Sequence, residues 1–365
     1  MRPLRVLHCP ALVGGHAYGL ARAERELGLE SRTLTLEQPQ YGYETDEVLF
    51  PEGTRRLARE LRRWGFVLRE LRSFDVVHFN FGSTLMPSQH PEAHVLTRLY
   101  ASLVGGADLR ALRGTTAVVA TYQGDDARQY AARFDALSGY FDPRADEARR
   151  ASIRRLTRRA DHVFALNPDL LAVLPPSATF LPYASVDPRE WPEIPPTGRG
   201  VPVIVHAPTD RNVKGTDHLV RAVAALRASG AEVELLLVEG VTRDEARAAY
   251  EQADLVVDQL ITGWYGAVAV EAMALGKPVL AHLHPDDLER VPSELAEELP
   301  VIDATPTTVE TVLRELVTDG GRLTELGRAG RRFVERWHDP RAVARTTKEI
   351  YEAAVRSRAI TTTSA

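Results

Sequence analysis

Two basic side chains three positions apart, Arg211 and Lys214, are the residues of this sequence best suited to chemistry on an anion. They follow an apolar run that ends at His206, so they lie where a buried strand would lead into a helix. Two fixed cations at such a point suit a diphosphate leaving group, because they stabilise the negative charge that develops as its bond breaks. The alternative is a solvated loop in which Asp210 or Asp217 pairs with them.

A lone carboxylate, Glu271, stands in an apolar stretch that we predict to be a helix over residues 267–275, closed by Gly276. A carboxylate among apolar neighbours is unfavourable unless it is paired or faces a cleft. In a cleft it can accept two hydrogen bonds from a ribose diol. The alternative is a position on a solvated stripe of the helix.

Two glycine-rich turns precede predicted helices. Gly263 and Gly266 bracket Trp264 and Tyr265, and the free amide groups at the start of the next helix can bind phosphate or sugar hydroxyls. Near the N-terminus a pair of glycines ends at Gly15, again before a predicted helix. This second turn is not a GxGxxG fingerprint, and it fits a plain tight turn equally well.

Strand-like and helix-like segments alternate along the chain, a pattern that favours βαβ units in parallel sheets. Residues 187–200 contain four prolines and two glycines and indicate a linker. We therefore predict an α/β protein with two Rossmann-like, doubly wound domains, residues 1–186 and 201–340. Ligands of such sheets lie beyond the carboxyl ends of the strands, so two facing edges would form a cleft. The predicted strands cover residues 5–9, 30–36, 75–79, 116–121, 162–166, 201–206, 233–238, 255–259 and 278–282. The predicted helices cover residues 16–27, 54–71, 144–159, 216–228, 242–252, 267–275, 307–317, 322–337 and 341–355.

Composition narrows the class further. The 365 residues carry a net charge of −5, which argues against nucleic-acid binding over the whole surface. Cys9 is the single cysteine, so no intrachain disulfide forms, as expected of a reducing, cytoplasmic compartment. The chain has no apolar run long enough for a transmembrane helix. The eleven histidines show no ligand spacing, and we expect neither a metal nor a cofactor.

The motifs together resemble those of a bacterial GT-B glycosyltransferase of the family 4 type, also called group 1. The resemblance is strong around Arg211, Lys214 and the stretch from Glu271 to Pro278. It is weaker at residues 78–82, 123–128 and 181–187. It implies a retaining, metal-independent transfer of a sugar from a nucleotide-diphosphate sugar, most often a UDP-sugar, to a small-molecule or glycan acceptor. It also implies that residues 341–365, a helix and tail, cross back onto the first domain.

The resemblance assigns roles to individual positions. Glu271 would hold the ribose, while Arg211 and Lys214 would neutralise the diphosphate during catalysis. Gly15 would let the phosphate approach from the first domain. The remaining donor-binding positions would be Glu239, Gly240 and Val241 beside the base, and Gly263, Trp264, Tyr265, Gly266, Ala267 and Val268 beside the sugar and phosphate. The acceptor or sugar side would include Asn80, Gln123 and Asp126.

Two positions depart from the family pattern. The family commonly has a second glutamate eight residues before the position of Glu271, where this chain has Gly263. It often has a histidine where Gln123 stands. Two other functions therefore remain open. One is a nucleotide-sugar-binding subunit without catalysis, and the other is a nucleotide-sugar epimerase or hydrolase on the same fold.

One predicted helix, residues 54–71, is amphipathic and rich in arginine. Leu57, Leu61, Trp64 and Leu68 share one face, and most of the arginines lie elsewhere. Such a helix can lie on anionic lipid as a peripheral contact. An ordinary helix packed on the core has the same pattern, so the sequence leaves both interpretations open. The oligomeric state is not indicated by the sequence.

Overall fold

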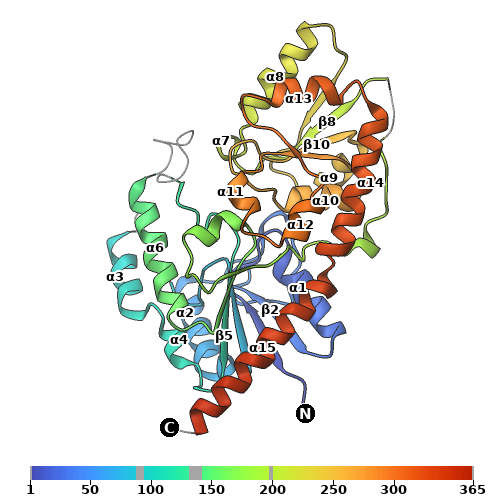
Figure 1. Cartoon of the computed structure of the whole chain (residues 1–365). Helices are drawn as coiled ribbons and strands as arrows, with labels where there is room; N and C mark the ends of the chain where they lie inside the picture. Colours follow the sequence, from blue (N-terminus) through green and yellow to red (C-terminus); the bar gives the residue numbers. More distant parts are fainter. Residues whose placement is uncertain (1, 88–93, 131–141, 197–199, 364–365) are drawn as a thin grey trace. The chain divides into compact units, whose positions relative to one another are not determined.

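The computed structural model describes residues 2–87, 94–130, 142–196 and 200–363. They form two compact units. The first contains the described residues up to 130, residues 142–184 and those from Pro340 onward, and the second runs from Ser185 to Asp339. Each unit is built on one parallel sheet with helices around it, so the predicted α/β class with two doubly wound sheets is confirmed (Figure 1). Residues 197–199 of the predicted linker lie outside the described residues.

The first unit contains a parallel sheet in the order β3-β2-β1-β4-β5-β6-β7. Its inner strands are short apolar runs buried on both faces, as parallel sheets require, and all five residues of β4 are buried. Seven strands make up the sheet: β1 (Arg5–Cys9), β2 (Glu30–Thr35), β3 (Glu47–Val48), β4 (Val76–Asn80), β5 (Ala117–Tyr122), β6 (His162–Ala165) and β7 (Thr179–Phe180).

Helices cover both faces of this sheet. One face packs against the turn after α2 and against α4 and α6, where residues such as Phe66, Leu109 and Ile153 meet Val77 and Phe79 of the sheet. The helices of this unit are α1 (His16–Glu26), α2 (Arg56–Gly65), α3 (Val95–Val104), α4 (Ala107–Ala111), α6 (Pro143–Thr157) and α15 (Pro340–Thr363). Helix α1 begins directly after Gly14 and Gly15, whose φ angles of 60° and 71° are accessible to glycine at little cost.

The opposite face of the first sheet carries α1 and the C-terminal helix α15, which pack against each other. The contact includes several buried polar side chains. His8 Nε2 lies 2.8 Å from Glu24 Oε2, and Thr347 Oγ1 donates to Glu24 Oε1 at 3.0 Å. The Tyr351 hydroxyl lies 2.6 Å from His78 Nδ1. These buried side chains tie a helix near the C-terminus to strands β1 and β4.

The second unit has a parallel sheet in the order β12-β11-β10-β8-β9. Its strands are β8 (Val203–His206), β9 (Glu234–Leu237), β10 (Leu255–Val257), β11 (Val279–Ala281) and β12 (Ile302–Asp303). Its helices are α7 (Arg211–Lys214), α8 (Thr216–Ala228), α9 (Arg243–Gln252), α10 (Ala267–Ala274), α11 (Pro285–Leu288), α12 (Ser293–Glu298), α13 (Val309–Leu316) and α14 (Gly320–Trp337). A capping box between Thr242 and Glu245 sets the start of α9.

The predicted helix over residues 54–71 differs most from the structure. Helix α2 ends at Gly65 and continues as a π-helical turn over Phe66–Glu70, which turns Phe66 and Val67 into the core. In α2 itself, Leu57 and Leu61 are exposed and do not pack on the core. In the described part of the chain no helix has both the length and the apolar character needed to cross a membrane.

Candidate functional site

The second unit places its candidate residues at the carboxyl ends of neighbouring strands. Strand β8 lies between β9 and β10, and the chain runs from β8 to one neighbour and then crosses to the other. The strand order therefore reverses beside β8, and open α/β sheets bind ligands at such a point. The loops after β8 and β10 carry Arg211, Lys214 and the glycine-rich segment, so the sheet brings these predicted residues to one edge.

Lys214 joins the two loops. It is the last residue of α7, and Gly215, at a φ of 74°, allows α8 to begin at once in a new direction. The Lys214 Nζ donates to Asp258 Oδ1 and to Gln259 Oε1, both at 2.8 Å. The Asp258 side chain is 1% exposed and also accepts from the amide of Gly266. The Lys214 ammonium group thus ties α7 to the end of β10, and the Asp258 carboxylate ties that end to the start of α10.

Arg211 lies on the same short helix and pairs with a different loop. Its Nε and Nη2 atoms donate to the two carboxylate oxygens of Glu239, each at 2.8 Å. The hydrogen bond from Arg211 lowers the pKa of Glu239 below its ordinary value. Both side chains are well exposed, at 50% and 39%. The structure therefore brings two predicted residues together as a surface pair that solvent or a ligand can reach.

Glu271 is buried in α10 with a cation beside it. Arg243, the first residue of α9, donates from Nε to Glu271 Oε1 at 2.8 Å and from Nη2 to the carbonyl oxygen of Ser185 at 2.9 Å. Its guanidinium group lies 5.4 Å from the ring centre of Trp191. Burial raises the pKa of Glu271, and Arg243 opposes that rise. The carboxylate is therefore a paired group at the ligand edge and not part of a solvated stripe.

Gly263 occupies a position that has no room for a side chain. A Cβ atom there would lie 2.4 Å from His284 Cβ and 3.2 Å from the His284 amide nitrogen. The His284 amide in turn donates to the Gly263 carbonyl oxygen at 3.0 Å. The backbone before α11 thus fills the space that a glutamate at this position would need.

The two aromatic residues that follow are packed inside the protein. The ring of Tyr265 is 0% exposed and contacts Phe333 and His338, with its hydroxyl 3.0 Å from His338 Nε2. Trp264 stacks on Tyr265 at a ring distance of 4.7 Å. The Tyr265 ring therefore belongs to the core of the unit. What this segment presents at its surface is the backbone around Gly266 and the half-buried Ala267 and Val268 at the start of α10.

In the first unit, the turn at Gly15 and the residue Asn80 lie at the carboxyl ends of β1 and β4, which are neighbours. His16, at the start of α1, accepts from the Ala184 amide through Nδ1 at 3.0 Å. Asn80 donates to the His78 carbonyl oxygen, while its own Oδ1 is buried and has no partner among the described residues. Buried polar atoms are nearly always satisfied, so this atom suits a ligand or a water.

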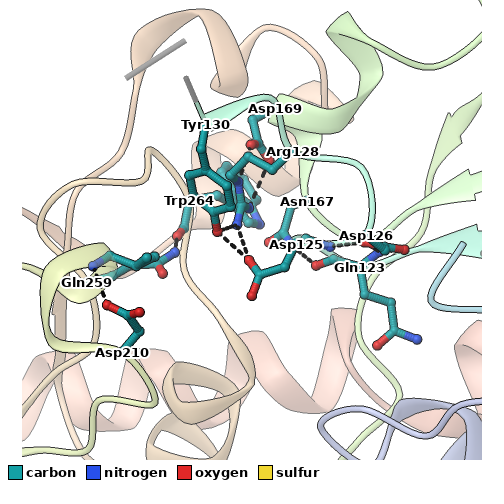
Figure 2. Close-up of polar contacts among 12 residues, drawn as sticks. Gln123, Asp125, Asp126, Arg128, Tyr130, Asn167, Asp169, Asp210, Gln259 and Trp264 are labelled. Atoms are coloured by element: carbon teal, nitrogen blue, oxygen red, sulfur yellow. Dashed lines mark hydrogen bonds and ion pairs between the residues drawn. The ribbon is translucent and has the colours of Figure 1, made fainter. Parts of the chain in front are cut away.

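The loop after β5 holds Gln123 and Asp126. The Asp126 carboxylate accepts from the amides of Gln123 and Gly124, at 3.0 and 2.7 Å (Figure 2). Burial raises the pKa of Asp126 to about 7. The Nε2 of Gln123 is buried without a partner in the described residues, as is the Asn80 oxygen. Asp126 therefore shapes the loop, and Gln123 offers a donor.

A buried network holds this loop in place (Figure 2). Arg128 forms a two-pronged ion pair with Asp169, at 2.7 and 3.3 Å, and donates to the Tyr130 hydroxyl at 3.2 Å. That hydroxyl donates to Asp125, and Asn167 donates to the Gln123 carbonyl oxygen. Such a buried arginine pair is rigid when every donor is satisfied. It fixes the backbone that carries Gln123 and Asp126.

The first unit also contains a cavity of about 450 Å³ beyond the ends of β1, β2 and β4. Arg59 and Arg63 of α2 and Arg155 of α6 line it, with Glu37 as the acidic side chain. The Nε of Arg63 is buried and unpartnered in the described structure. Arg59 pairs with Glu37 and Arg63 with Glu60, so a negatively charged ligand in this cavity would compete with these carboxylates for the arginines.

Several residues at these edges escaped prediction from the sequence. Arg243, Asp258 and Gln259 act through contacts with residues that are distant in the chain, and Asn167 and Asp169 do the same in the first unit. Asp258 lies inside the strand predicted over residues 255–259, and it directly follows the observed β10, which ends at Val257. Among the described residues, no group of three or more His, Cys, Asp or Glu side chains is arranged to hold a metal ion.

No protein-family model matches the chain, and no curated protein sequence matches it. Solved structures do match its fold. The sucrose-phosphate synthase of Thermosynechococcus elongatus superposes with a TM-score of 0.63 at 14% identity, over 97% of this chain and 100% of that one. HepE of Anabaena, in complex with UDP-glucose, gives a TM-score of 0.62 at 13% identity, over 96% and 100%.

A third solved structure also matches the fold. An alpha-glucosyltransferase in complex with UDP-glucose and DNA gives a TM-score of 0.62 at 11% identity, over 96% of this chain and 100% of that one. At such identities the matches establish the fold alone, which is that of the GT-B glycosyltransferases. The absence of nucleic-acid binding stays a prediction from net charge.

Proposed function

We propose that this chain is a glycosyltransferase of the GT-B type that moves a sugar from a nucleotide-diphosphate sugar to an acceptor. The observation that carries the proposal is the edge of the second sheet at β8. There a half-buried ammonium group and an exposed guanidinium group on α7 and a buried carboxylate on α10 lie at the position where α/β sheets bind nucleotides. Structures of the same fold were solved with UDP-glucose, which supports a UDP-sugar as donor.

In this proposal the protein supplies positioning and charge rather than a nucleophile. Glu271 accepts from the ribose hydroxyls, and Arg243 keeps its carboxylate ionised and oriented. Lys214 and Arg211 stabilise the diphosphate as the bond to the sugar breaks. The amide groups of Ala267 and Val268, at the start of α10, bind the phosphate or sugar, while the Gly266 amide stays on Asp258. The transfer proceeds with retention and without a metal ion, as the sequence resemblance to family 4 implies.

We place the acceptor at the carboxyl edge of the first sheet. The unpartnered Asn80 and Gln123 amide atoms and the cavity lined by Arg59, Arg63 and Arg155 support this assignment. Three guanidinium groups favour an acceptor, small molecule or glycan, that bears a phosphate or a carboxylate. Asp126 acts on this side as a positioning residue for the loop. A bacterial origin and a cytoplasmic location remain predictions from the sequence.

The test measures two quantities for the full chain and three variants. These are the affinity for UDP and the rate at which UDP-glucose is consumed. Glu271→Gln and Lys214→Gln keep hydrogen-bonding groups beside Arg243 and Asp258 but remove one charge of each pair, so the thermal unfolding midpoint of both variants is measured to separate a loss of stability from a loss of function. Lys348→Gln, whose native ammonium group donates to the Leu27 carbonyl oxygen, is the matched control. We expect Lys214→Gln to lower kcat by roughly 10²–10³ and the control to match the wild type. Unchanged UDP affinity and turnover in both site variants would refute the site.

The alternative of a binding subunit without catalysis is supported by the glycine at position 263. Because backbone fills the place of the family's second glutamate, a nucleotide-sugar-binding subunit would explain its loss. Calorimetric binding of UDP-glucose without release of UDP, across a panel of anionic acceptors, would favour this alternative. Release of free glucose or epimerised sugar from donor alone would instead favour a hydrolase or an epimerase.

A further inference from the structure

Two neighbouring helices of the first unit expose large apolar side chains to solvent. On α2 and the turn after it, Leu57, Leu61 and Leu68 are 74%, 67% and 55% exposed. Helix α3 exposes four more apolar side chains, by up to 73% of their surface: Val95, Leu96, Leu99 and Leu103. Of the four residues on the apolar face of the helix predicted over residues 54–71, these three leucines are therefore not packed on the core. Exposed apolar side chains in such a group mark an interaction surface.

The two leucine stripes flank one contact between the helices. The Trp64 indole donates to the Tyr100 hydroxyl at 3.2 Å, and that hydroxyl donates to Glu60 at 2.5 Å. Leu61 and Leu68 lie three and four positions from Trp64. Leu96 and Leu103 lie four and three positions from Tyr100, and residues at these spacings are neighbours on a helix surface. The stripes therefore border the same junction, on the side of the unit where Figure 1 shows α2 and α3.

The surroundings of the stripes are basic. Residues 54–73 hold seven arginines and two glutamates, a net charge of +5 in a chain whose total is −5. Glu60 and Glu70 are both engaged, with Arg63 and Arg32 respectively. Four arginines on or beside the stripes form no ion pair with any described residue: Arg55, Arg56, Arg69 and Arg98. Apolar side chains bordered by unpaired arginines suit a partner that has an anionic outer layer and an apolar layer beneath it.

We propose that the α2–α3 face, defined by these seven apolar residues and four arginines, docks on an anionic lipid bilayer. The leucines would enter the boundary between head groups and acyl chains, and the arginines would remain with the anionic head groups. A second copy of the chain fits less well, because a symmetric contact would bring the same arginines together. Nucleic acid fits less well too, since the leucines would gain nothing from phosphate.

The test is sedimentation of the full chain with vesicles, without any nucleotide sugar. One set of vesicles contains phosphatidylcholine and phosphatidylglycerol, and the other contains phosphatidylcholine alone. We expect binding to the anionic vesicles that weakens as salt is added, and much weaker binding to neutral ones. Because no donor is present, a failure here is separate from a failure of the proposed glycosyl transfer.

Two double variants dissect the surface. Arg55→Gln with Arg56→Gln should weaken binding about fivefold per arginine, so roughly 25-fold together. Leu61→Ser with Leu99→Ser should weaken binding at least as much, without changing the thermal unfolding midpoint, because both side chains are exposed. The control Ile360→Ser removes a side chain that is 70% exposed on α15 and should change nothing.

Three results would overturn the proposal: no binding to anionic vesicles, equal binding to both kinds, or binding that the double variants leave unchanged. A concentration-dependent dimer in light scattering, abolished by Leu61→Ser with Leu99→Ser, would assign the face to a second copy instead. Binding that is anionic, salt-sensitive and lost in both double variants supports it.

Discussion

Gly263 permits a sharp test of how the second unit is built. A methyl group added at this position would lie 2.4 Å from His284 Cβ and 3.1 Å from Asp287 Oδ2. The first atom is fixed directly to the backbone that precedes α11, and the second is a side-chain oxygen. The His284 amide nitrogen lies 3.2 Å from the added carbon and donates to the Gly263 carbonyl oxygen. The turn cannot swing away like the end of a flexible side chain. Gly263→Ala must therefore displace backbone.

The magnitude follows from the displacement. Forcing one extra carbon into a packed region typically destabilises a protein by about 1–3 kcal/mol. For a unit of this size each kcal/mol lowers the melting temperature by about 2–4 °C, so we expect a fall of roughly 2–12 °C. Gly263→Glu should fall further, because it adds a carboxylate beside Asp287 in the same space. Restoring the family's glutamate should therefore damage this protein rather than improve it.

Differential scanning calorimetry of the full chain measures the effect on the transition of the second unit. The control is Gly320→Ala, at the start of α14, where nothing lies within 4 Å of the added carbon. That variant should keep the wild-type midpoint or raise it slightly. If Gly263→Ala melted within 1 °C of Gly320→Ala (about 0.25–0.5 kcal/mol), the argument that backbone occupies the glutamate position would be refuted.

Three further predictions follow from buried polar groups. Arg243→Gln removes the cation that opposes the raised pKa of Glu271, so the pH midpoint for UDP binding by calorimetry should move upward; an unmoved midpoint would count against the pairing. Asp126 has a folded pKa of about 7 against an ordinary 3.8, so the folded state holds its proton more tightly and wild-type stability should fall as pH rises from 4 through 7. The thermal unfolding midpoint of Asp126→Asn should therefore fall less between pH 5 and pH 8 than that of the wild type. Equal falls in the two proteins would contradict this prediction. Tyr351→Phe leaves His78 Nδ1 without its partner and should lower the free energy of unfolding, measured with urea, by about 1–3 kcal/mol. Tyr41→Phe, at an exposed position, should leave it unchanged.

Much of the fold could be predicted because local patterns dominate its elements. The helix predicted over residues 216–228 and the strand over 5–9 agree with α8 and β1 at both ends. In each case an apolar pattern ends at a glycine, a proline or a polar turn that stops the element for a local reason. The π-helical turn at Phe66 was missed because it depends on which side chains the core accepts, and not on the local pattern.

The candidate site divides in the same way. Arg211, Lys214 and Glu271 were found because cations after a strand and a carboxylate in an apolar helix are local signals. Arg243 was missed, because its contact with Glu271 joins residues 28 positions apart. The packing of Tyr265 was missed for a similar reason, since its partners Phe333 and His338 come from the end of the unit.

The pairs at the donor edge also differ in how readily they can exchange partners. Arg211 and Glu239 form a well-exposed pair, and such pairs contribute little to stability, so a diphosphate can take Arg211 from Glu239 with little loss. Lys214 faces a carboxylate that is 1% exposed, and removing the partner of a buried charge is strongly unfavourable. Lys214 should therefore stay on Asp258 and act on a ligand from that fixed position. In the proposed reaction Arg211 is the cation that moves to the nucleotide, and Lys214 is the cation that is already in place.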